Sequence, residues 1–223
     1  MSGELVRFDD VVARLRSALL APLPGATAQD RLSPRPRRVW PATFDPANVR
    51  HAACLLLLFP RDGRAHLVLT LRADTLGRHG GQVSLPGGVI EPGESLEQAA
   101  LREAQEEIGL EASEVQTLGA LTPVDIPVSG FRLHPIVAAA ADRPALHASD
   151  GEVARILEVP LEQLIDPARL VWRTSRRDDR DVAVPAFVVD GVDIWGATAM
   201  VLAELLALLG QGGQAGENGR AMD

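Results

Sequence analysis

Hydrophobic and polar positions along the chain follow two periods, one typical of helices and one typical of strands. Apolar residues recur at helical spacing in residues 9 to 20 and again in residues 195 to 209, which predicts a helix near each end. Short apolar runs between them predict strands at 51–59, 66–72, 115–126, 133–140, 153–159, 171–174 and 182–189. The first two runs flank turn residues and are expected to form a hairpin, and the last two are expected to form another.

A third helix is expected from about residue 96 to residue 108. Ser95 and Gln98 have the spacing of a capping box, and Gly109 supplies the stop that a helix C-terminus favours. Residues three and four positions apart are neighbours on a helix. One face of this helix therefore carries three carboxylates, those of Glu103, Glu106 and Glu107.

Three carboxylates on one helix face repel one another unless cations compensate their charge. Hard oxygen ligands of this kind suit Mg²⁺ or Mn²⁺. A solvated acidic face is the alternative for a helix rich in glutamate. Gly87 and Gly88, which precede the helix, favour the metal site, because glycine lets the backbone approach a ligand without a side-chain clash.

One catalytic domain with appended ends is the expected organisation of a chain of 223 residues, 46% of them hydrophobic. Prolines between positions 22 and 46 break any long element, so residues 1–48 are interpreted as a helix followed by a proline-rich arm. The catalytic domain is assigned to residues 49–209. Residues 210–223 are rich in Gly and Gln, lack a core-forming pattern and are predicted to be disordered.

Charge and cysteine content exclude several function classes. The formal net charge of -8 disfavours a nucleic-acid partner, because general binding of that kind draws its affinity from phosphates neutralised by basic residues. No apolar stretch reaches the roughly twenty residues that span a bilayer, so no membrane association is expected. The single cysteine, Cys54, stands in an apolar run, which predicts a buried thiol, and a reducing, cytoplasmic compartment fits this cysteine usage.

The segment from Gly88 to Leu110 resembles the complete Nudix box, G-x(5)-E-x(7)-R-E-U-x-E-E-x-G-U, in which U is aliphatic. The fixed positions are occupied by Gly88, Glu94, Arg102, Glu103, Glu106, Glu107 and Gly109. Seven fixed matches have a chance probability on the order of 10⁻⁹ per starting position. The resemblance to the Nudix hydrolase family is therefore specific.

The Nudix resemblance implies an α/β fold, an α/β/α sandwich with a mixed sheet, and a loop–helix–loop metal site for Mg²⁺ or Mn²⁺. It implies that the metal is held by Glu103, Glu106, Glu107 and the backbone at Gly87. Glu106 and Glu107 are then also catalytic residues, and Arg102 would orient the carboxylates by charge-assisted hydrogen bonds. Glu94 would be structural or an outer partner of the site. Glu152 stands where many members place a further acid, as general base or additional metal ligand, and a solvated loop glutamate is the alternative.

A second resemblance lies upstream, in residues 68–88. The coenzyme A pyrophosphatase branch of the family carries L-L-T-x-R-[SA]-x(3)-R-x(3)-G-x(3)-F-P-G-G there, and most positions match. Gly77 replaces the second arginine and Leu85 replaces the phenylalanine. The branch implies cleavage of coenzyme A into 3′,5′-ADP and 4′-phosphopantetheine. Its phosphates would contact Arg72, Arg78 and His79, and a structural ion pair is the alternative for Arg72.

Two other functions compete with coenzyme A hydrolysis. The box specifies chemistry more than substrate, so ADP-ribose or a dinucleotide polyphosphate is the alternative within enzymes. Outside enzymes, the chain could be a binding module that senses a nucleotide without cleaving it, although three convergent carboxylates argue for catalysis. In every case the expected partner is a small phosphorylated molecule, and the family resemblance suggests a homodimer.

Overall fold

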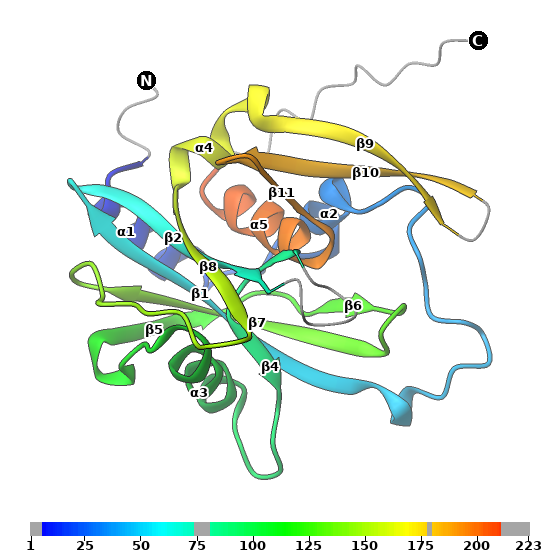
Figure 1. Cartoon of the computed structure of the whole chain (residues 1–223), viewed down its shortest axis with the longest axis horizontal. Helices are drawn as coiled ribbons and strands as arrows, with labels where there is room; N and C mark the ends of the chain where they lie inside the picture. The colour runs from blue at the N-terminus through cyan, green and yellow to red at the C-terminus, as the bar shows by residue number, and fades with distance from the viewer. Residues whose placement is uncertain (1–5, 74–80, 178–179, 211–223) are drawn as a thin grey trace.

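A mixed β-sheet forms the centre of the computed structural model, which describes residues 6–73, 81–177 and 180–210 (Figure 1). Its strands are β1 (Arg50–Arg61), β2 (Arg64–Arg72), β3 (Val83–Ser84), β4 (Gly87–Val89), β5 (Val115–Ala120), β6 (Val124–Ile126), β7 (Phe131–Ala140) and β8 (Val153–Pro160). β1 pairs in parallel with β7 and antiparallel with β2 and β4. β5 and β6 pair with β7, whereas β3 and β8 pair with β2.

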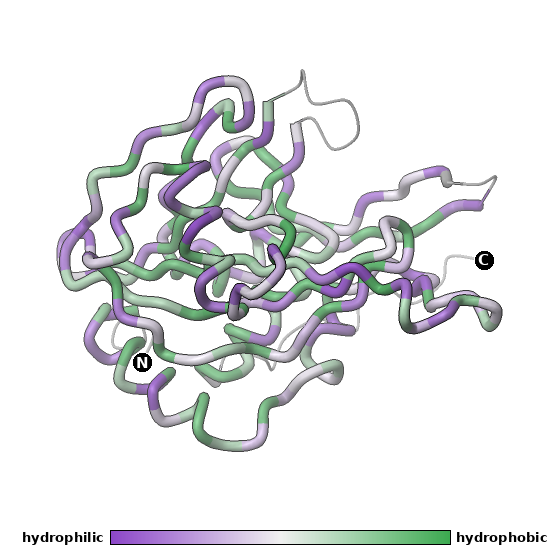
Figure 2. Tube along the Cα trace, turned by 90° about the horizontal axis from the view of Figure 1, so that it is seen from below, coloured by the Kyte–Doolittle hydropathy of each residue, from purple (hydrophilic) through white to green (hydrophobic). Residues whose placement is uncertain are grey.

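Strand β1 is covered on both faces, which explains its continuous apolar run. Successive side chains of a strand point to opposite faces. Leu56 and Leu58 accordingly belong to one hydrophobic cluster, whereas Leu55 and Leu57 belong to a second, and all four are fully buried. Figure 2 shows hydrophobic stretches of the chain running through the middle of the molecule. Two separate cores therefore flank the central sheet.

The two cores are closed by different helices. Helix α3 (Leu96–Ile108) covers one face of the sheet through its small buried residues and Ile108. The other face is covered by α1 (Phe8–Ala18) and α5 (Gly196–Leu208), and α2 (Gly25–Gln29) packs against α5. These layers confirm the predicted α/β/α sandwich, and the three long helices lie within two residues of their predicted bounds.

A second, three-stranded sheet was only partly predicted. It contains β9 (Leu170–Arg177) and β10 (Arg180–Val189), which form the predicted hairpin, and β11 (Val192–Trp195), which the sequence analysis missed. The prediction of one strand over 115–126 is wrong, because β5 ends at Ala120 and β6 begins at Val124. Pro123 has no backbone N–H to continue a ladder, and the N–H of Thr122 is donated to the side chain of Glu204.

The proline-rich arm is attached to the body of the molecule at two places. The amide of Gln29 donates to the carboxylate of Glu204 at 2.8 Å, in the buried interface with α5. Further along, Arg35 and Ala183 exchange two backbone hydrogen bonds of 2.8 and 2.9 Å, which form an isolated bridge between the arm and β10. Short helical turns occur at Asp30–Leu32, Pro46–Asn48, Ala112–Glu114 and Pro167–Arg169, and α4 is Leu161–Ile165.

Two remaining sequence predictions concern the C-terminal segment and membrane association. The disorder predicted for 210–223 falls, beyond Gly210, outside them. None of the helices in the described part of the chain is long and apolar enough to cross a membrane.

Candidate active site

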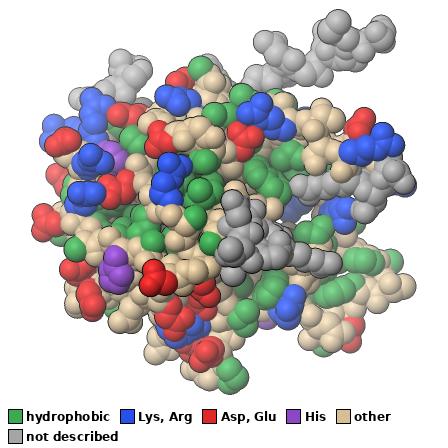
Figure 3. Space-filling view, viewed as in Figure 1, with side chains coloured by type: hydrophobic (Ala, Val, Ile, Leu, Met, Phe, Trp, Pro, Cys, Tyr) green, Lys and Arg blue, Asp and Glu red, His purple; other side chains and the backbone are tan. Residues whose placement is uncertain are grey.

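Helix α3 begins and ends as its sequence predicts, and this fixes the direction of its acidic face. The Ser95 hydroxyl accepts a hydrogen bond from the Gln98 N–H at 3.1 Å, and the Gln98 side chain accepts one from the Ser95 N–H at 2.8 Å. Gly109 takes the left-handed conformation, with φ of 65°, that ends the helix. Figure 3 shows acidic side chains gathered over the lower part of the molecule, where α3 lies.

Glu107 is the buried member of the acidic face, with a side chain only 5% exposed. One of its carboxylate oxygens accepts a hydrogen bond from the N–H of Gly87 at 3.3 Å, and the other lies 3.5 Å from Nη1 of Arg72. Burial raises the pKa of the Glu107 carboxyl to about 7, although Arg72 and the Gly87 N–H act in the opposite direction. The site therefore holds a carboxylate that lacks full charge compensation.

Glu103 lies against the backbone at Gly88. A Cβ atom at position 88 would overlap the Glu103 carboxylate, so only glycine leaves room for it. Burial raises the pKa of Glu103, against the lowering effect of Arg102. Gly88 thus has a steric role in the site, because it lets the Glu103 carboxylate approach the main chain of β4.

Arg102 donates hydrogen bonds to the outer carboxylates of the site. Its guanidinium donates two hydrogen bonds to Glu94, at 2.7 and 3.1 Å, and further ones to Glu103 at 2.9 Å and Glu106 at 3.1 Å. These bonds lower the pKa of Glu94 and raise that of Arg102. Glu106 is the exposed member of the face, with a side chain 58% accessible.

Glu152 comes to the acidic face from a distant part of the chain. It precedes β8, and its backbone oxygen accepts a hydrogen bond from the N–H of Ala73 at 2.9 Å, next to Arg72. The charge of Glu152 contributes to the raised pKa values of Glu103 and Glu107. Its side chain is exposed and lies within electrostatic range of both, so the two interpretations of its role stay open.

A divalent cation fits the chemistry of these residues. The donors are carboxylate oxygens, and burial together with the charges of neighbouring carboxylates raises the pKa values of Glu103 and Glu107. Gly88 lets the Glu103 carboxylate lie against the main chain. Within the described residues, however, no three Asp, Glu, His or Cys side chains form a preassembled metal cluster. The hydrogen bonds of Arg102 and the ion pair of Arg72 hold the carboxylates instead.

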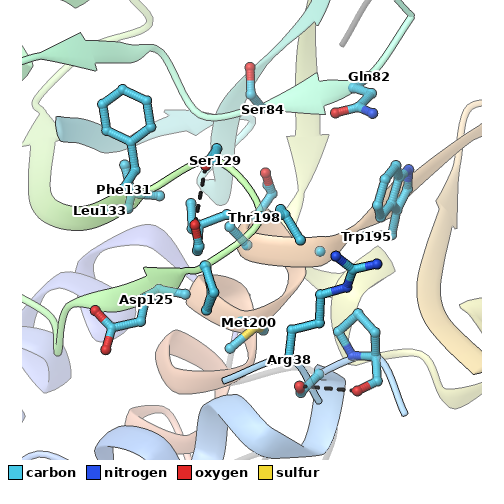
Figure 4. Close-up of a pocket in the computed structure, with 18 of the residues that line it drawn as sticks. Arg38, Gln82, Ser84, Asp125, Ser129, Phe131, Leu133, Trp195, Thr198 and Met200 are labelled. Atoms are coloured by element: carbon cyan, nitrogen blue, oxygen red, sulfur yellow. Dashed lines mark hydrogen bonds between the residues drawn. The ribbon is translucent and has the colours of Figure 1, made fainter. Parts of the chain in front are cut away.

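A cavity of about 1000 Å³ opens beside the acidic face (Figure 4). One wall contains Gly87, Gly88 and Arg72, and the others are built by residues 124–133, the beginning of α5 and the arm. Among the described residues, four arginines line this cavity: Arg37, Arg38, Arg72 and Arg180. Asp125 is the acidic residue among the described lining residues, and Arg132 pairs with it at 2.7 Å.

Within the described residues, the cavity contains the predicted substrate residue Arg72 and several residues that the sequence analysis missed. Arg72 lines the cavity, as a residue that binds substrate would, and it also forms an ion pair with Glu107, as a structural residue would. Both interpretations of Arg72 therefore stay open. Arg78 and His79 lie outside the described residues. The missed residues come from the arm, β10 and α5, and only the fold brings these segments to the box.

The glycine pair offers a direct test of the site geometry. Gly88→Ala should displace the Glu103 carboxylate and lower turnover by about ten- to hundredfold, the usual effect of disturbing groups that orient ligands. Gly87→Ala should instead lower thermal stability, because its Cβ would overlap backbone atoms of Ala53 and Cys54. Steady-state kinetics and melting temperatures of both variants separate the effects. Wild-type turnover in Gly88→Ala would contradict the assigned geometry.

The NUDIX domain family model matches residues 49–178. A protein named uncharacterized Nudix hydrolase NudL from Yersinia enterocolitica is 39% identical over 166 residues, which cover 74% of this chain and 84% of the relative. The protein of the same name from Photorhabdus laumondii is 35% identical over 178 residues, 79% of this chain and 91% of the relative. The solved Nudix hydrolase RenU from M. smegmatis is 30% identical, with a TM-score of 0.46 over 52% of this chain and 73% of that chain.

Proposed function

The chain belongs to the Nudix hydrolase family, whose members act on pyrophosphate-containing substrates, and from this we propose that it cleaves coenzyme A or a derivative. The products would be 3′,5′-ADP and 4′-phosphopantetheine. The observation that carries the proposal is the cavity of about 1000 Å³ in a protein of net charge -8. Its described lining includes four arginines, and two of its lining residues, Gly87 and Arg72, contact the carboxylate of Glu107. Its volume suits a large ligand, and its arginines suit a substrate with several phosphates.

Enzymes of this family generally use divalent metal cations, and we propose Mg²⁺ or Mn²⁺ here. Glu103, Glu106 and Glu107, with the backbone at Gly87, would hold it. When bound, the cation supplies polarisation of a phosphoryl oxygen and a lower pKa for a coordinated water.

The protein's own residues have distinct parts in this proposal. Arg102 keeps the outer carboxylates oriented, through hydrogen bonds to three of them. Glu152 is the proposed acceptor of the proton from the attacking water, because it is exposed and lies within electrostatic range of Glu103 and Glu107. Arg72 stands between the cavity and Glu107, where it can bind a phosphate oxygen next to the reacting bond.

Arg72→Ala tests the substrate assignment. The loss of a charged hydrogen bond of roughly 1.5–3 kcal/mol should lower kcat/KM for coenzyme A by about ten- to hundredfold. Activity on a smaller nucleoside diphosphate should fall less, because fewer of its phosphates reach this anchor. Equal losses on both substrates, together with a lower Tm, would instead assign Arg72 a structural role as the partner of Glu107.

A panel of pyrophosphate compounds with Mg²⁺ or Mn²⁺, with products resolved by chromatography, decides between the candidate functions. Release of 3′,5′-ADP from coenzyme A is the expected result. Cleavage of ADP-ribose or a dinucleotide polyphosphate in its place would refute the coenzyme A proposal but would still identify the protein as a pyrophosphate hydrolase. Tight nucleotide binding without turnover under any metal condition would favour the non-catalytic module.

A further inference from the structure

The segment 147–152 leads into β8 and ends with Glu152, the proposed proton acceptor. Most of its side chains are exposed, and exposed loops are generally more mobile than the elements they connect. Its C-terminal end is fixed to β2, because the backbone oxygen of Glu152 accepts a hydrogen bond from the N–H of Ala73 at 2.9 Å. The next residue, Val153, pairs with Arg72 in the sheet. How precisely Glu152 faces the acidic helix therefore depends on what holds the other end of the segment.

The other end of the segment is bonded to the last turn of α3. The final carbonyl groups of a helix have no partner within the helix. The N–H of His147 donates a hydrogen bond to the oxygen of Ile108 at 3.0 Å. The N–H of Ser149 donates one to the main-chain oxygen of Glu107 at 2.9 Å. Glu107 therefore contacts the segment through its main chain, while its carboxylate belongs to the proposed metal site.

Gly109 makes room for the ring of His147. This glycine ends α3 in the left-handed conformation, which asparagine can also adopt. A Cβ atom at position 109 would, however, overlap three atoms of the imidazole ring of His147. Only glycine therefore lets the ring lie against the end of the helix. In this chain Gly109 has a steric role besides that of ending α3.

We infer that His147 is a positioning residue for Glu152. Its ring lies against Gly109 and its N–H is bonded to Ile108, so the start of the segment is fixed to the helix turn that contains Glu107. Displacing a reacting group by about 1 Å costs on the order of 10²-fold in rate, so efficient proton transfer requires a fixed segment. The inference rests on the proposed function, in which Glu152 accepts the proton from the attacking water, and adds the residue that holds this acceptor in place.

Double-mutant kinetics test this role. On coenzyme A, or on whichever compound of the panel the protein cleaves fastest, His147→Ala should lower kcat by about tenfold and change KM by less than about twofold. KM should hold because residues 147–152 are not among the described residues that line the cavity. Glu152→Gln should lower kcat by about 10²-fold or more, as the loss of a general base does. Adding His147→Ala to Glu152→Gln should cause no further loss.

The outcomes of this cycle separate the inference from the proposed function. Additive losses, or a Glu152→Gln protein with wild-type kcat, overturn the inference even though the wild-type protein hydrolyses its substrate. Absence of turnover by the wild-type protein on every compound refutes the proposed function, and the inference falls with it.

His147→Phe distinguishes positioning from chemistry performed by the imidazole. Phenylalanine keeps a flat ring against Gly109 but has no titratable nitrogen, so this variant should retain at least about half of the wild-type kcat. A loss equal to that of His147→Ala would overturn the inference. The Mg²⁺ concentration that gives half-maximal activity should change by less than about twofold in both variants. A larger rise would mean that His147 acts through the metal site at Glu107, and would also overturn it.

Gly109→Ala tests the contact from the side of the helix. Its Cβ should displace the His147 ring and lower kcat by about tenfold. Gly191→Ala is the matched control, because Gly191 has a similar φ, 79° against 65°, but open space where a Cβ would lie. Both variants should lower Tm through backbone strain, and only Gly109→Ala should lower kcat.

Hydrogen exchange read by mass spectrometry reports on the segment itself. Exchange in residues 147–152 should be faster in His147→Ala and Gly109→Ala than in the wild-type protein, and unchanged in Gly191→Ala. Wild-type exchange of this segment in the first two variants would show that the ring does not hold it, and would overturn the inference.

Discussion

Glu107→Gln is expected to lower kcat by roughly 10³-fold, because it removes several kcal/mol of transition-state stabilisation. The amide keeps nearly the same volume, but it cannot bring a negative charge to a cation beside Gly87. Added Mg²⁺ should raise the Tm of the wild-type protein through binding to the folded state, and this increase should be smaller in the variant. Kinetics at saturating Mg²⁺ and thermal melts with and without the metal measure both effects.

Stability in metal-free buffer distinguishes a catalytic role of Glu107 from a structural one. Burial raises the pKa of this carboxyl from 4.5 to about 7, so between these values the folded protein retains a proton that the unfolded chain releases. The free energy of unfolding should then fall as pH rises from about 4.5 to about 7, and Glu107→Gln should lack this contribution. Glu97→Gln, on the exposed first turn of the same helix, is the control. A glutamine variant with near-normal turnover would refute the assignment.

Glu204→Ala is expected to destabilise the folded protein by roughly 3–5 kcal/mol, one of the largest effects available to a single substitution. Glu204 is fully buried in α5 and accepts hydrogen bonds from Gly25, Gln29 and Thr122. Alanine would leave these donors unpaired in the core. For a chain of this size the change corresponds to a fall in Tm on the order of 10 °C, measurable by calorimetry.

Two further variants show whether the Glu204 network accounts for this effect. Glu204→Gln keeps the volume and one acceptor oxygen, so it should lie between the wild type and Glu204→Ala in stability. Gln29→Ala combined with Glu204→Ala should cost less than the sum of the single changes, because both remove the same 2.8 Å hydrogen bond. Strict additivity, or a Glu204→Ala protein with an unchanged Tm, would contradict a joining role between the arm and α5.

The acidic helix could be predicted from the sequence because its signals are local. Its capping residue, the glycine that ends it and its three glutamates lie within fifteen residues of one another. Each of these signals depends only on residues nearby in the sequence. The ion pair between Arg102 and Glu106 is local as well, because the two residues are four positions apart on the helix. Burial within the helix is harder to read, since Glu106 and Glu107 are adjacent in sequence and only the packing of β4 makes Glu107 the buried one.

The walls of the cavity could not be predicted in the same way. Arg38 and Arg180 line the same cavity because Arg35 of the arm pairs with Ala183 of β10, a contact that no periodicity encodes. The break between β5 and β6 depends equally on a distant residue, Glu204, which takes the Thr122 N–H out of the sheet. The division of the chain into arm, domain and tail, the homodimer and the cytoplasmic location stay predictions.

Alkylation of Cys54 can measure how often the central strand of the folded protein opens. Cys54 is the chain's single thiol, it is buried in β1 beneath the cavity, and burial raises its pKa, so the reactive thiolate is suppressed while the strand is packed. An alkylating reagent therefore modifies only molecules whose central strand has opened, and each molecule gains at most one label. Because a ligand in the cavity raises the free energy of that opening, pulse labelling read by mass spectrometry becomes a binding assay that requires neither turnover nor a chromophore.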